Sequence, residues 1–267
     1  TQRFKAVVFD YDGTLCSSQS KDAPPPPSVV DHLVRLARAG IVVGIASGRG
    51  GSIQACLQDV MPHDVLPKIR LGLYNGGWIA AADVPPKPAA ETSEFLSHVT
   101  RIVVRLKSQG VPILAHRTTH PFQVSVRFRE GLATDGMWFV IADALRQAGL
   151  DLSTMVRSKH SVDILAKGVS KSALVADIIQ KDKVDPYEIL TMGDQGAWPG
   201  NDAALLEHRY SLSVDMPSRR LDRAWKLAPA EKRDVDATLW YLERMALEEG
   251  GVFRLAFPDA GDSGGAQ

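Results

Sequence analysis

The sequence predicts an α/β protein whose Rossmann-like core is built on a parallel sheet and carries an inserted small α+β domain. Two patterns support this. In the first third of the chain, short apolar runs that end in polar turns alternate with segments of helical apolar spacing, as in strand–helix–strand units. Between residues 83 and 165 the order changes to one helix followed by two strands, twice over, which is typical of an antiparallel sheet covered on one face. The first pattern resumes after residue 166.

The core elements before the insertion follow from apolar runs and their boundaries. The run at residues 5–9 indicates a fully buried strand, and Gly40 marks the end of the first helix. The expected elements are, in order, a strand at 5–9, a stiff proline-rich loop at 16–27, a helix at 28–39, a strand at 41–46, a helix at 52–60 and a turn at 74–78 between two short apolar runs.

The inserted region and the return to the core are expected to follow the same rules. For the insertion we expect a helix at 91–109, strands at 112–115 and 123–128, a helix at 134–148, and strands at 152–157 and 162–165. For the second half of the core we expect a helix at 170–180, a strand at 188–192, a helix beginning at 203–207, a strand at 210–214 and a helix at 238–248. The predicted domains are 1–82 with 166–258, 83–165, and a disordered tail at 259–267 that is rich in small and polar residues.

Composition narrows the function classes. Among 267 residues the formal net charge is zero, which gives no support to binding of nucleic acid or of a membrane surface. No apolar run approaches the ~20 residues of a membrane span, and the first run is too short for a signal peptide. Cys16 and Cys56 have no metal-ligand spacing and indicate reduced thiols, so we expect a cytoplasmic protein. Thr1 in place of methionine fits either a processed chain or part of a longer one.

Polar side chains follow three of the predicted core strands. Asp10 and Asp12 follow the first, Ser47 with Gly48 and Arg49 the second, and Asp194 a later one. In an open parallel sheet, ligands bind beyond the carboxyl ends of the strands, so we expect these side chains to converge. Clustered carboxylates repel one another and a phosphate, which makes a cation such as Mg²⁺ necessary.

Such a crevice has the groups that phosphoryl transfer needs. One aspartate can attack phosphorus, and a carboxyl two residues away can protonate the leaving oxygen and later deprotonate water. The Ser47 hydroxyl and the amides that open the next helix can hold phosphoryl oxygens. A lysine is needed to balance the anionic transition state, and Lys167 and Lys171 both flank the return to the core.

Four ordered motifs carry a family resemblance that covers most of the chain. They are Asp10-Tyr11-Asp12-Gly13-Thr14-Leu15, Ser47-Gly48-Arg49, Lys171 within Gly168-Val169-Ser170-Lys171, and Gly193-Asp194 with Asn201-Asp202. This set resembles the haloacid dehalogenase superfamily. The inserted α+β region is similar to the type-two cap of that superfamily, and the turn at Asn75-Gly76-Gly77 resembles its Cof-type branch, which consists mostly of sugar-phosphate and cofactor-phosphate phosphatases.

The resemblance implies a role for each matching residue. Asp10 is the expected nucleophile and a Mg²⁺ ligand, and Asp12 is the expected general acid and base, with its backbone carbonyl on the metal. Ser47, Gly48 and Arg49 are expected to bind the transferring phosphoryl group, although Arg49 fits a solvated helix-start residue equally well. Lys171, which motif position favours over Lys167, is expected to steady the nucleophile and the phosphate. Asp194 is the expected further metal ligand, and Asp202 is expected to support the metal shell.

Two regions depart from the pattern or leave alternatives open. The fourth motif is four residues longer than the usual Gly-Asp-Gly-x-Asn-Asp, and Trp198 on it fits either stacking on a substrate or packing on the core or cap. In the insertion, several cationic residues fit either recognition of an anionic substrate or simple solvation. They are His116, His120, Arg117, Arg127 and Arg129.

These observations predict a magnesium-dependent phosphatase that hydrolyses a small phosphorylated metabolite, such as a sugar phosphate, through an aspartyl-phosphate. Asp12 argues against a dehalogenase, which does not need that second carboxyl. The alternatives are a phosphomutase and a non-catalytic sensor or interaction domain on a phosphatase scaffold. The wording of the first motif is also similar to trehalose-phosphate phosphatases, whose fourth motif differs. Neither the substrate nor the oligomeric state follows from the sequence.

Overall fold

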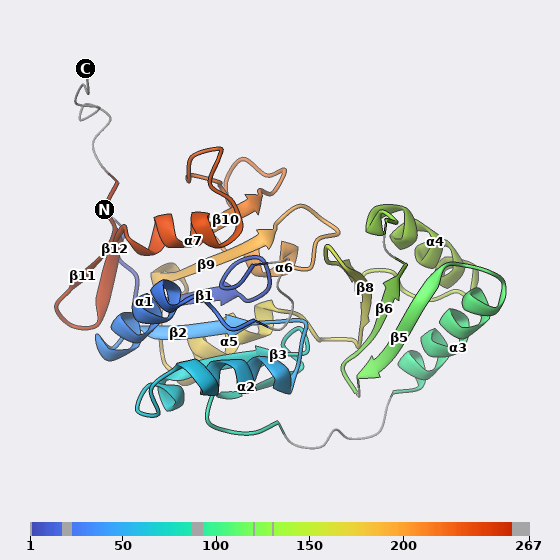
Figure 1. The fold of residues 1–267 in the computed structure, drawn as a ribbon, viewed down its shortest axis with the longest axis horizontal. Coiled ribbons are helices and arrows are strands. Elements are labelled where there is room, and N and C mark those ends of the chain that lie inside the picture. The colour runs from blue at the N-terminus through green and yellow to red at the C-terminus, as the bar shows by residue number, and fades with distance from the viewer. Residues whose placement is uncertain (1, 18–22, 87–92, 120, 130, 258–267) are drawn as a thin grey trace.

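The computed structural model describes residues 2–17, 23–86, 93–119, 121–129 and 131–257 (Figure 1). Its core is a six-stranded sheet of order β10-β9-β1-β2-β3-β4. The strands are β1 (Ala6–Asp10), β2 (Val42–Ala46), β3 (Ile69–Leu73), β4 (Trp78–Ala81), β9 (Ile189–Gln195) and β10 (Ser211–Met216). Neighbouring strands pair in parallel except at the β3–β4 edge, which confirms the predicted α/β core.

Helices cover both faces of this sheet because its central strands are apolar on both sides. In β1, Val7 and Phe9 join one hydrophobic cluster and Ala6 and Val8 join another, as the period of two in a strand requires. The first cluster also contains residues of α1 (Pro27–Arg38), α2 (Gly51–Val60) and α7 (Asp234–Leu242). The second contains residues of α5 (Ser172–Lys181) and α6 (Ala203–Leu206).

The region between β4 and α5 forms a smaller layered unit, which we call the cap (residues 93–165). Its antiparallel sheet has the order β5-β6-β8-β7, with β5 (Ile113–Thr119), β6 (Gln123–Phe128), β7 (Met155–Arg157) and β8 (Ser161–Leu165). The helices α3 (Glu94–Ser108) and α4 (Thr134–Gln147) pack on one face and share a separate hydrophobic cluster with it. The opposite face is turned toward the core (Figure 1). The exact boundaries at residues 82 and 166 stay a prediction.

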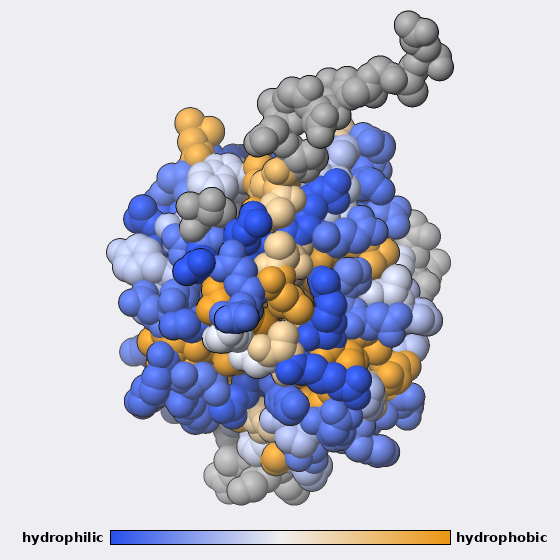
Figure 2. All heavy atoms as spheres, turned by 90° about the vertical axis from the view of Figure 1, so that its left-hand side faces the viewer, coloured by the Kyte–Doolittle hydropathy of each residue, from blue (hydrophilic) through white to orange (hydrophobic). Residues whose placement is uncertain are grey.

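The predicted helix at 238–248 is wrong in its second half. α7 ends at Leu242, and β11 (Met245–Glu248) pairs with β12 (Val252–Leu255) in an antiparallel hairpin. The short apolar run of β11 fits a strand as well as a helix, and Gly250 and Gly251 supply the positive φ angles of the turn. Phe253 is fully buried and exchanges backbone hydrogen bonds with Phe4. At this end of the core, a narrow band of hydrophobic residues crosses a mostly hydrophilic surface (Figure 2).

Other differences are smaller. β9 extends to Gln195, past the predicted end at 192, and α6 forms only one turn. Two short 3₁₀ helices, Leu66–Lys68 and Pro186–Glu188, precede β3 and β9. The expected tail at 259–267, part of the proline-rich loop and His120 lie outside the described residues. In the part of the chain that is described, no helix has both the length and the apolar character to cross a membrane.

Candidate active site

The predicted functional residues of the core meet where the direction of the sheet connections changes. Asp10 ends β1, Ser47 follows β2, and Asp194 lies near the end of β9, so three adjacent strands contribute. The chain leaves β1 toward the face covered by α1 and leaves β9 toward the face covered by α6. Such a switch point opens a crevice beyond the carboxyl ends of the strands.

Lys171 lies at the centre of this crevice. Its Nζ donates to Asp10 Oδ1 at 2.5 Å and to Asp202 Oδ1 at 2.6 Å, and the side chain is 1% exposed. Thr14 Oγ1 donates to the other Asp10 oxygen at 3.4 Å. Lys167, the alternative lysine, is exposed at the surface. One buried cation is therefore shared between two buried carboxylates.

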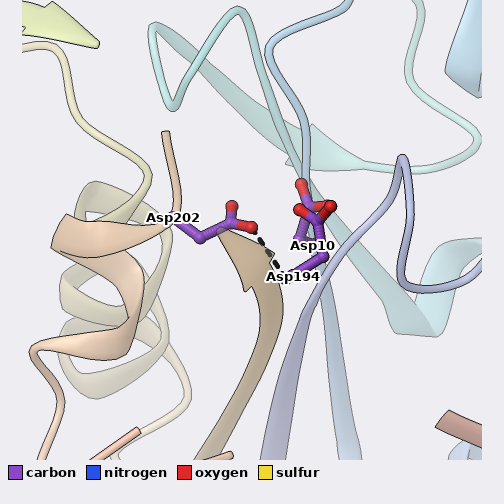
Figure 3. A group of neighbouring side chains, drawn as sticks. All are labelled: Asp10, Asp194 and Asp202. Carbon is purple, nitrogen blue, oxygen red and sulfur yellow. Dashed lines mark hydrogen bonds between the residues drawn. The ribbon is translucent and has the colours of Figure 1, made fainter. Parts of the chain in front are cut away.

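Asp202 uses its second oxygen to hold the end of β9. Its Oδ2 accepts hydrogen bonds from the backbone N–H of Asp194 at 2.9 Å and of Gln195 at 3.1 Å. Figure 3 shows the carboxylate reaching from the segment before α6 to this backbone. Both oxygens of Asp202 are therefore engaged by other groups of the protein.

The three buried carboxylates titrate differently. Burial, and then the charge of Asp202, raise the pKa of Asp10 well above its ordinary range. The same two causes raise the pKa of Asp194 to about 7. Burial alone would also raise the pKa of Asp202, but the charge and hydrogen bond of Lys171 hold it below the usual value. If all three carboxyls were ionised, the cluster would carry more negative charge than the buried lysine balances, and this excess opposes the ionisation of Asp10 and Asp194.

This donor set fits a divalent cation that prefers oxygen ligands. One oxygen from each of Asp10, Asp194 and Asp202 lies within 4.8 Å of the others. A few carboxylates of this kind are what Mg²⁺ binds together with substrate oxygens and water. Gly13 keeps the site open: at its φ of +83° a Cβ would lie 2.6 Å from Asp194 Oδ2, so no larger residue fits there without displacing the carboxylate.

The Asp12 side chain belongs to a different part of the site. Its Oδ1 pairs with Arg49 at 3.1 Å, and its Oδ2 accepts a hydrogen bond from Ser47 Oγ at 3.5 Å. Ser47 Oγ also accepts from the Arg49 backbone N–H at 3.0 Å, and Arg49 Nη2 donates to Ser52. Arg49 is thus held against the second aspartate, where the sequence had left its role open.

A cavity of ≈ 610 Å³ lies between this crevice and the cap. Asp12, Gly48, Arg49 and Asp194 line its core side. The cap side is lined mainly by polar residues of the sheet and of the turn between β7 and β8: His116, Arg117, Gln123, Ser125, Arg127, Ser158, Lys159, His160, Ser161 and Asp163. A space of this size, lined by the core on one side and the cap on the other, is typical of a small-molecule site.

Lys159 was not singled out by the sequence analysis. It extends from the β7–β8 turn of the cap into the core, where its Nζ lies 3.0 Å from Asp194, 3.1 Å from Asp215 and 3.0 Å from Asp234. Burial alone would lower the pKa of Lys159, but the charge of Asp194 and hydrogen bonds to the three carboxylates raise it. A lysine in a polar turn gives no sequence signal for such a role, because the three acids converge only in the folded core.

The lengthened fourth motif docks on the cap. The Arg157 N–H donates to Pro199 O at 2.8 Å, and the Asn201 N–H donates to Arg157 O at 2.9 Å. The Trp198 ring meets Trp138 of α4 edge to face, with centroids 5.3 Å apart. Of the two alternatives for Trp198, the structure therefore shows packing on the cap, and this side chain is 67% exposed.

Other predicted cap residues divide into two groups. His116, Arg117 and Arg127 line the cavity, whereas Arg129 is exposed away from the described lining. Gln123 of β6 makes a contact with the core that the sequence did not predict: its side chain accepts from Asn75 Nδ2 at 2.8 Å and donates to Gly48 O at 3.0 Å. An amide on the polar face of an alternating strand is a weak signal for such a contact.

Comparison with known proteins agrees with this architecture. The sequence profile of the sucrose-6F-phosphate phosphohydrolases matches residues 98–234, slightly over half of the chain. The chain belongs to this family. The match confirms the prediction of a haloacid dehalogenase-type hydrolase of the phosphatase class. The comparison with curated protein sequences gives no significant match.

Solved structures show the same fold at low sequence identity. A trehalose-6-phosphate phosphatase from Aspergillus fumigatus is 21% identical, with a TM-score of 0.55 over 90% of this chain and 93% of the other. A subclass IIB sugar phosphatase of the same superfamily is 20% identical, with a TM-score of 0.54 over 79% of this chain and 87% of the other. A Plasmodium falciparum IMP-nucleotidase is 10% identical, with a TM-score of 0.60 over 90% and 70%. At these identities the likeness is one of fold.

Proposed function

We propose that this protein is a magnesium-dependent phosphatase that hydrolyses a small phosphorylated metabolite, with sugar phosphates as the leading substrate class. The observation that carries the proposal is the paired carboxylates at the end of β1. Asp10 is buried against Lys171, and Asp12 lines the cavity two residues later. The family match adds the expectation of a phosphorylated sugar.

In the first half of the reaction, a carboxylate oxygen of Asp10 attacks the phosphorus atom. The new P–O bond forms as the ester P–O bond breaks, which yields an aspartyl-phosphate and an alkoxide. The Asp12 carboxyl gives its proton to that alkoxide, so the alcohol leaves neutral. Asp12 suits this task because its side chain is 38% exposed and faces the cavity, while the Asp10 side chain is 2% exposed.

In the second half, water replaces the alcohol. The ionised Asp12 takes a proton from the water, whose oxygen attacks phosphorus and displaces the Asp10 carboxylate. Inorganic phosphate and the original carboxylate result, and Asp12 again carries its proton. Arg49 holds the Asp12 side chain in place between the two halves through its 3.1 Å contact.

The remaining residues hold charge in place. Asp10, Asp194 and the Asp12 backbone carbonyl would hold Mg²⁺, with Asp202 supporting them. When bound, the metal supplies positive charge that keeps Asp10 ionised and draws electron density from the phosphoryl oxygens. Lys171 adds a buried positive charge beside the nucleophile, and Ser47 and the Gly48 amide bind phosphoryl oxygens. The cap lines the other side of the cavity and, by closing over a bound substrate, would exclude bulk water.

A phosphate-release assay on a panel of sugar phosphates, nucleotides and an aryl phosphate tests the proposal. We expect turnover that requires Mg²⁺ and that falls at least ~10³-fold in Asp10→Asn, because the amide does not replace the nucleophile. Asp31→Asn, an exposed aspartate on α1, is the matched control and keeps full activity. Activity that survives Asp10→Asn would refute the mechanism. Phosphorylated product without free phosphate would indicate the mutase alternative.

A further inference from the structure

We propose that the substrate carries a second anionic group, a carboxylate or a phosphate, which Arg117 and Arg127 of the cap bind at the far side of the cavity. This inference rests on the proposed function and specifies its substrate class. It concerns the non-reacting part of the substrate, which the cap selects.

The two arginines share one face of the cap sheet. On β6, Val124, Val126 and Phe128 belong to the hydrophobic cluster beneath the helices, so Arg127 points to the opposite face. Arg117 of β5 pairs with Ser125, and Arg127 pairs with Ala115. They are therefore diagonal neighbours on adjacent strands, about 7–8 Å apart at Cα, within reach of each other's long side chains. Both line the cavity.

Neither arginine has a partner among the described residues. No hydrogen bond or ion pair joins Arg117 or Arg127 to another side chain in residues 2–17, 23–86, 93–119, 121–129 and 131–257. The other cations of the cavity and crevice are engaged: Arg49 by Asp12, Lys159 by Asp194 and two further acids, and Lys171 by Asp10 and Asp202. At this separation, two unpaired guanidinium groups repel each other. An anion that bridges them removes this repulsion.

The one described acid on the cap side of the cavity does not neutralise them. Asp163 is only 5% exposed and lies opposite Ser125 on the neighbouring strand. Burial raises its pKa, which weakens its negative charge. The imidazoles of His116 and His160 also line this side. The cap side of the cavity is therefore net positive. The acids of the core side are those to which the proposed function gives a role in the reaction.

The guanidinium geometry specifies the ligand chemistry. Each arginine offers a planar fork of N–H donors that matches the two oxygens of a carboxylate or phosphate. A neutral sugar hydroxyl does not match the charge of two such groups. Phosphorylated sugar acids and sugar bisphosphates both meet the requirement, and a comparison of the two distinguishes a carboxylate from a phosphate.

Matched substrate pairs test the proposal. Glucose 6-phosphate and 6-phosphogluconate differ in one terminal carboxylate, and fructose 6-phosphate and fructose 1,6-bisphosphate differ in one phosphate. We expect the wild-type kcat/KM to be at least ~30-fold higher for the member of one pair that carries the second anionic group, mainly through KM. In Arg117→Met with Arg127→Met, this preference falls to under about 3-fold, because kcat/KM falls much more for that member than for the one with a single phosphate. Arg129→Met, on the same cap but outside the described lining, keeps the preference.

Binding measurements separate this inference from the proposed function. Calorimetry on Asp10→Asn compares the same pairs without turnover, so the preference is visible even if no substrate is hydrolysed. Lysine at both positions, which keeps the charge but loses the fork, should restore part of the preference and also shows that the cap folds. Equal affinity for both members of both pairs would overturn the inference, as would an equal loss for both members in the double methionine variant.

Discussion

The two sides of the cavity differ in how their charges are compensated. On the core side, Lys171 joins Asp10 to Asp202, and Arg49 pairs with Asp12. On the cap side, Arg117 and Arg127 face the cavity with no described partner. On the proposed function, this difference separates two tasks. The core would hold its reacting groups in one fixed arrangement, whereas the cap would leave its charges available to a ligand.

Lys159 connects the two sides. It belongs to the cap by sequence, but its charge is neutralised by three aspartates of the core. Arg157, which ends β7 directly before this turn, hydrogen-bonds through its backbone to Pro199 and Asn201. The cap is thus fastened to the core beside Asp194, and the cavity lies between the residues proposed to select the substrate and those proposed to react.

The largest expected effect comes from removing the cation of the core side. Lys171→Met leaves Asp10 and Asp202 buried without a positive partner, and breaking a buried pair in this way costs about 3–5 kcal/mol of stability. We also expect kcat to fall by at least ~10³-fold because the charge beside the nucleophile is lost. Denaturant unfolding and phosphate release measure the two effects.

Lys167→Met is the control for this comparison. The lysine lies four residues earlier and is exposed, so both stability and activity should stay close to the wild type. A Lys171→Met protein as stable as the wild type would show that the core carboxylates do not depend on this pairing.

The next effect concerns pH and the metal. In the metal-free protein, Asp194 has its pKa raised from 3.8 to about 7, so the folded state binds a proton more tightly than the unfolded chain does. Stability should therefore fall as pH rises from about 4 to about 7. Mg²⁺ competes with that proton, so its affinity should rise on the order of tenfold between pH 5.5 and 7.5, with proton release. Calorimetric Mg²⁺ titrations in two buffers of different ionisation heat measure this.

Asp194→Asn tests whether Asp194 is the source of this pH dependence. The variant should bind Mg²⁺ weakly at both pH values. Its stability should fall less steeply with pH than that of the wild type, and the raised pKa of Asp10 accounts for the fall that is left. If the affinity of the wild type for Mg²⁺ is independent of pH, then Mg²⁺ binding does not displace a proton from Asp194.

The contrast between the core side and the cap side also explains which site residues the sequence could predict. Asp10, Asp12, Ser47 and Asp194 each sit at the end of a strand, and the parallel sheet brings those ends together once the strands are recognised. Lys171 followed from its motif. These are local patterns whose meeting point is determined by topology alone.

The cap contacts could not be predicted in this way. Lys159 and Trp198 reach partners whose approach depends on how the cap sits on the core, and no local pattern encodes that orientation. The β11–β12 hairpin was missed for a related reason. Its strands are four residues each, too short for periodicity to distinguish a strand from a helix, and Phe4 at the other end of the sequence completes their packing.

The smallest expected effect tests the fastening of the cap. Trp198→Ala removes an edge-to-face contact with Trp138, worth about 0.5–1.5 kcal/mol. Because Trp198 does not line the described cavity, kcat/KM should fall by less than about 3-fold. The amides of Arg157 and Asn201, which bridge cap and core, should exchange hydrogen about 2- to 10-fold faster, the factor that corresponds to this energy.

Phe139→Ala is a matched control, since Phe139 also meets Trp138 edge to face, with centroids 5.2 Å apart, but from within α4. It loses an aromatic contact without crossing the interface, so the exchange of the bridging amides should not change. Equal acceleration in both variants would mean that α4 packing, and not the Trp198 contact, controls how the cap is held against the core.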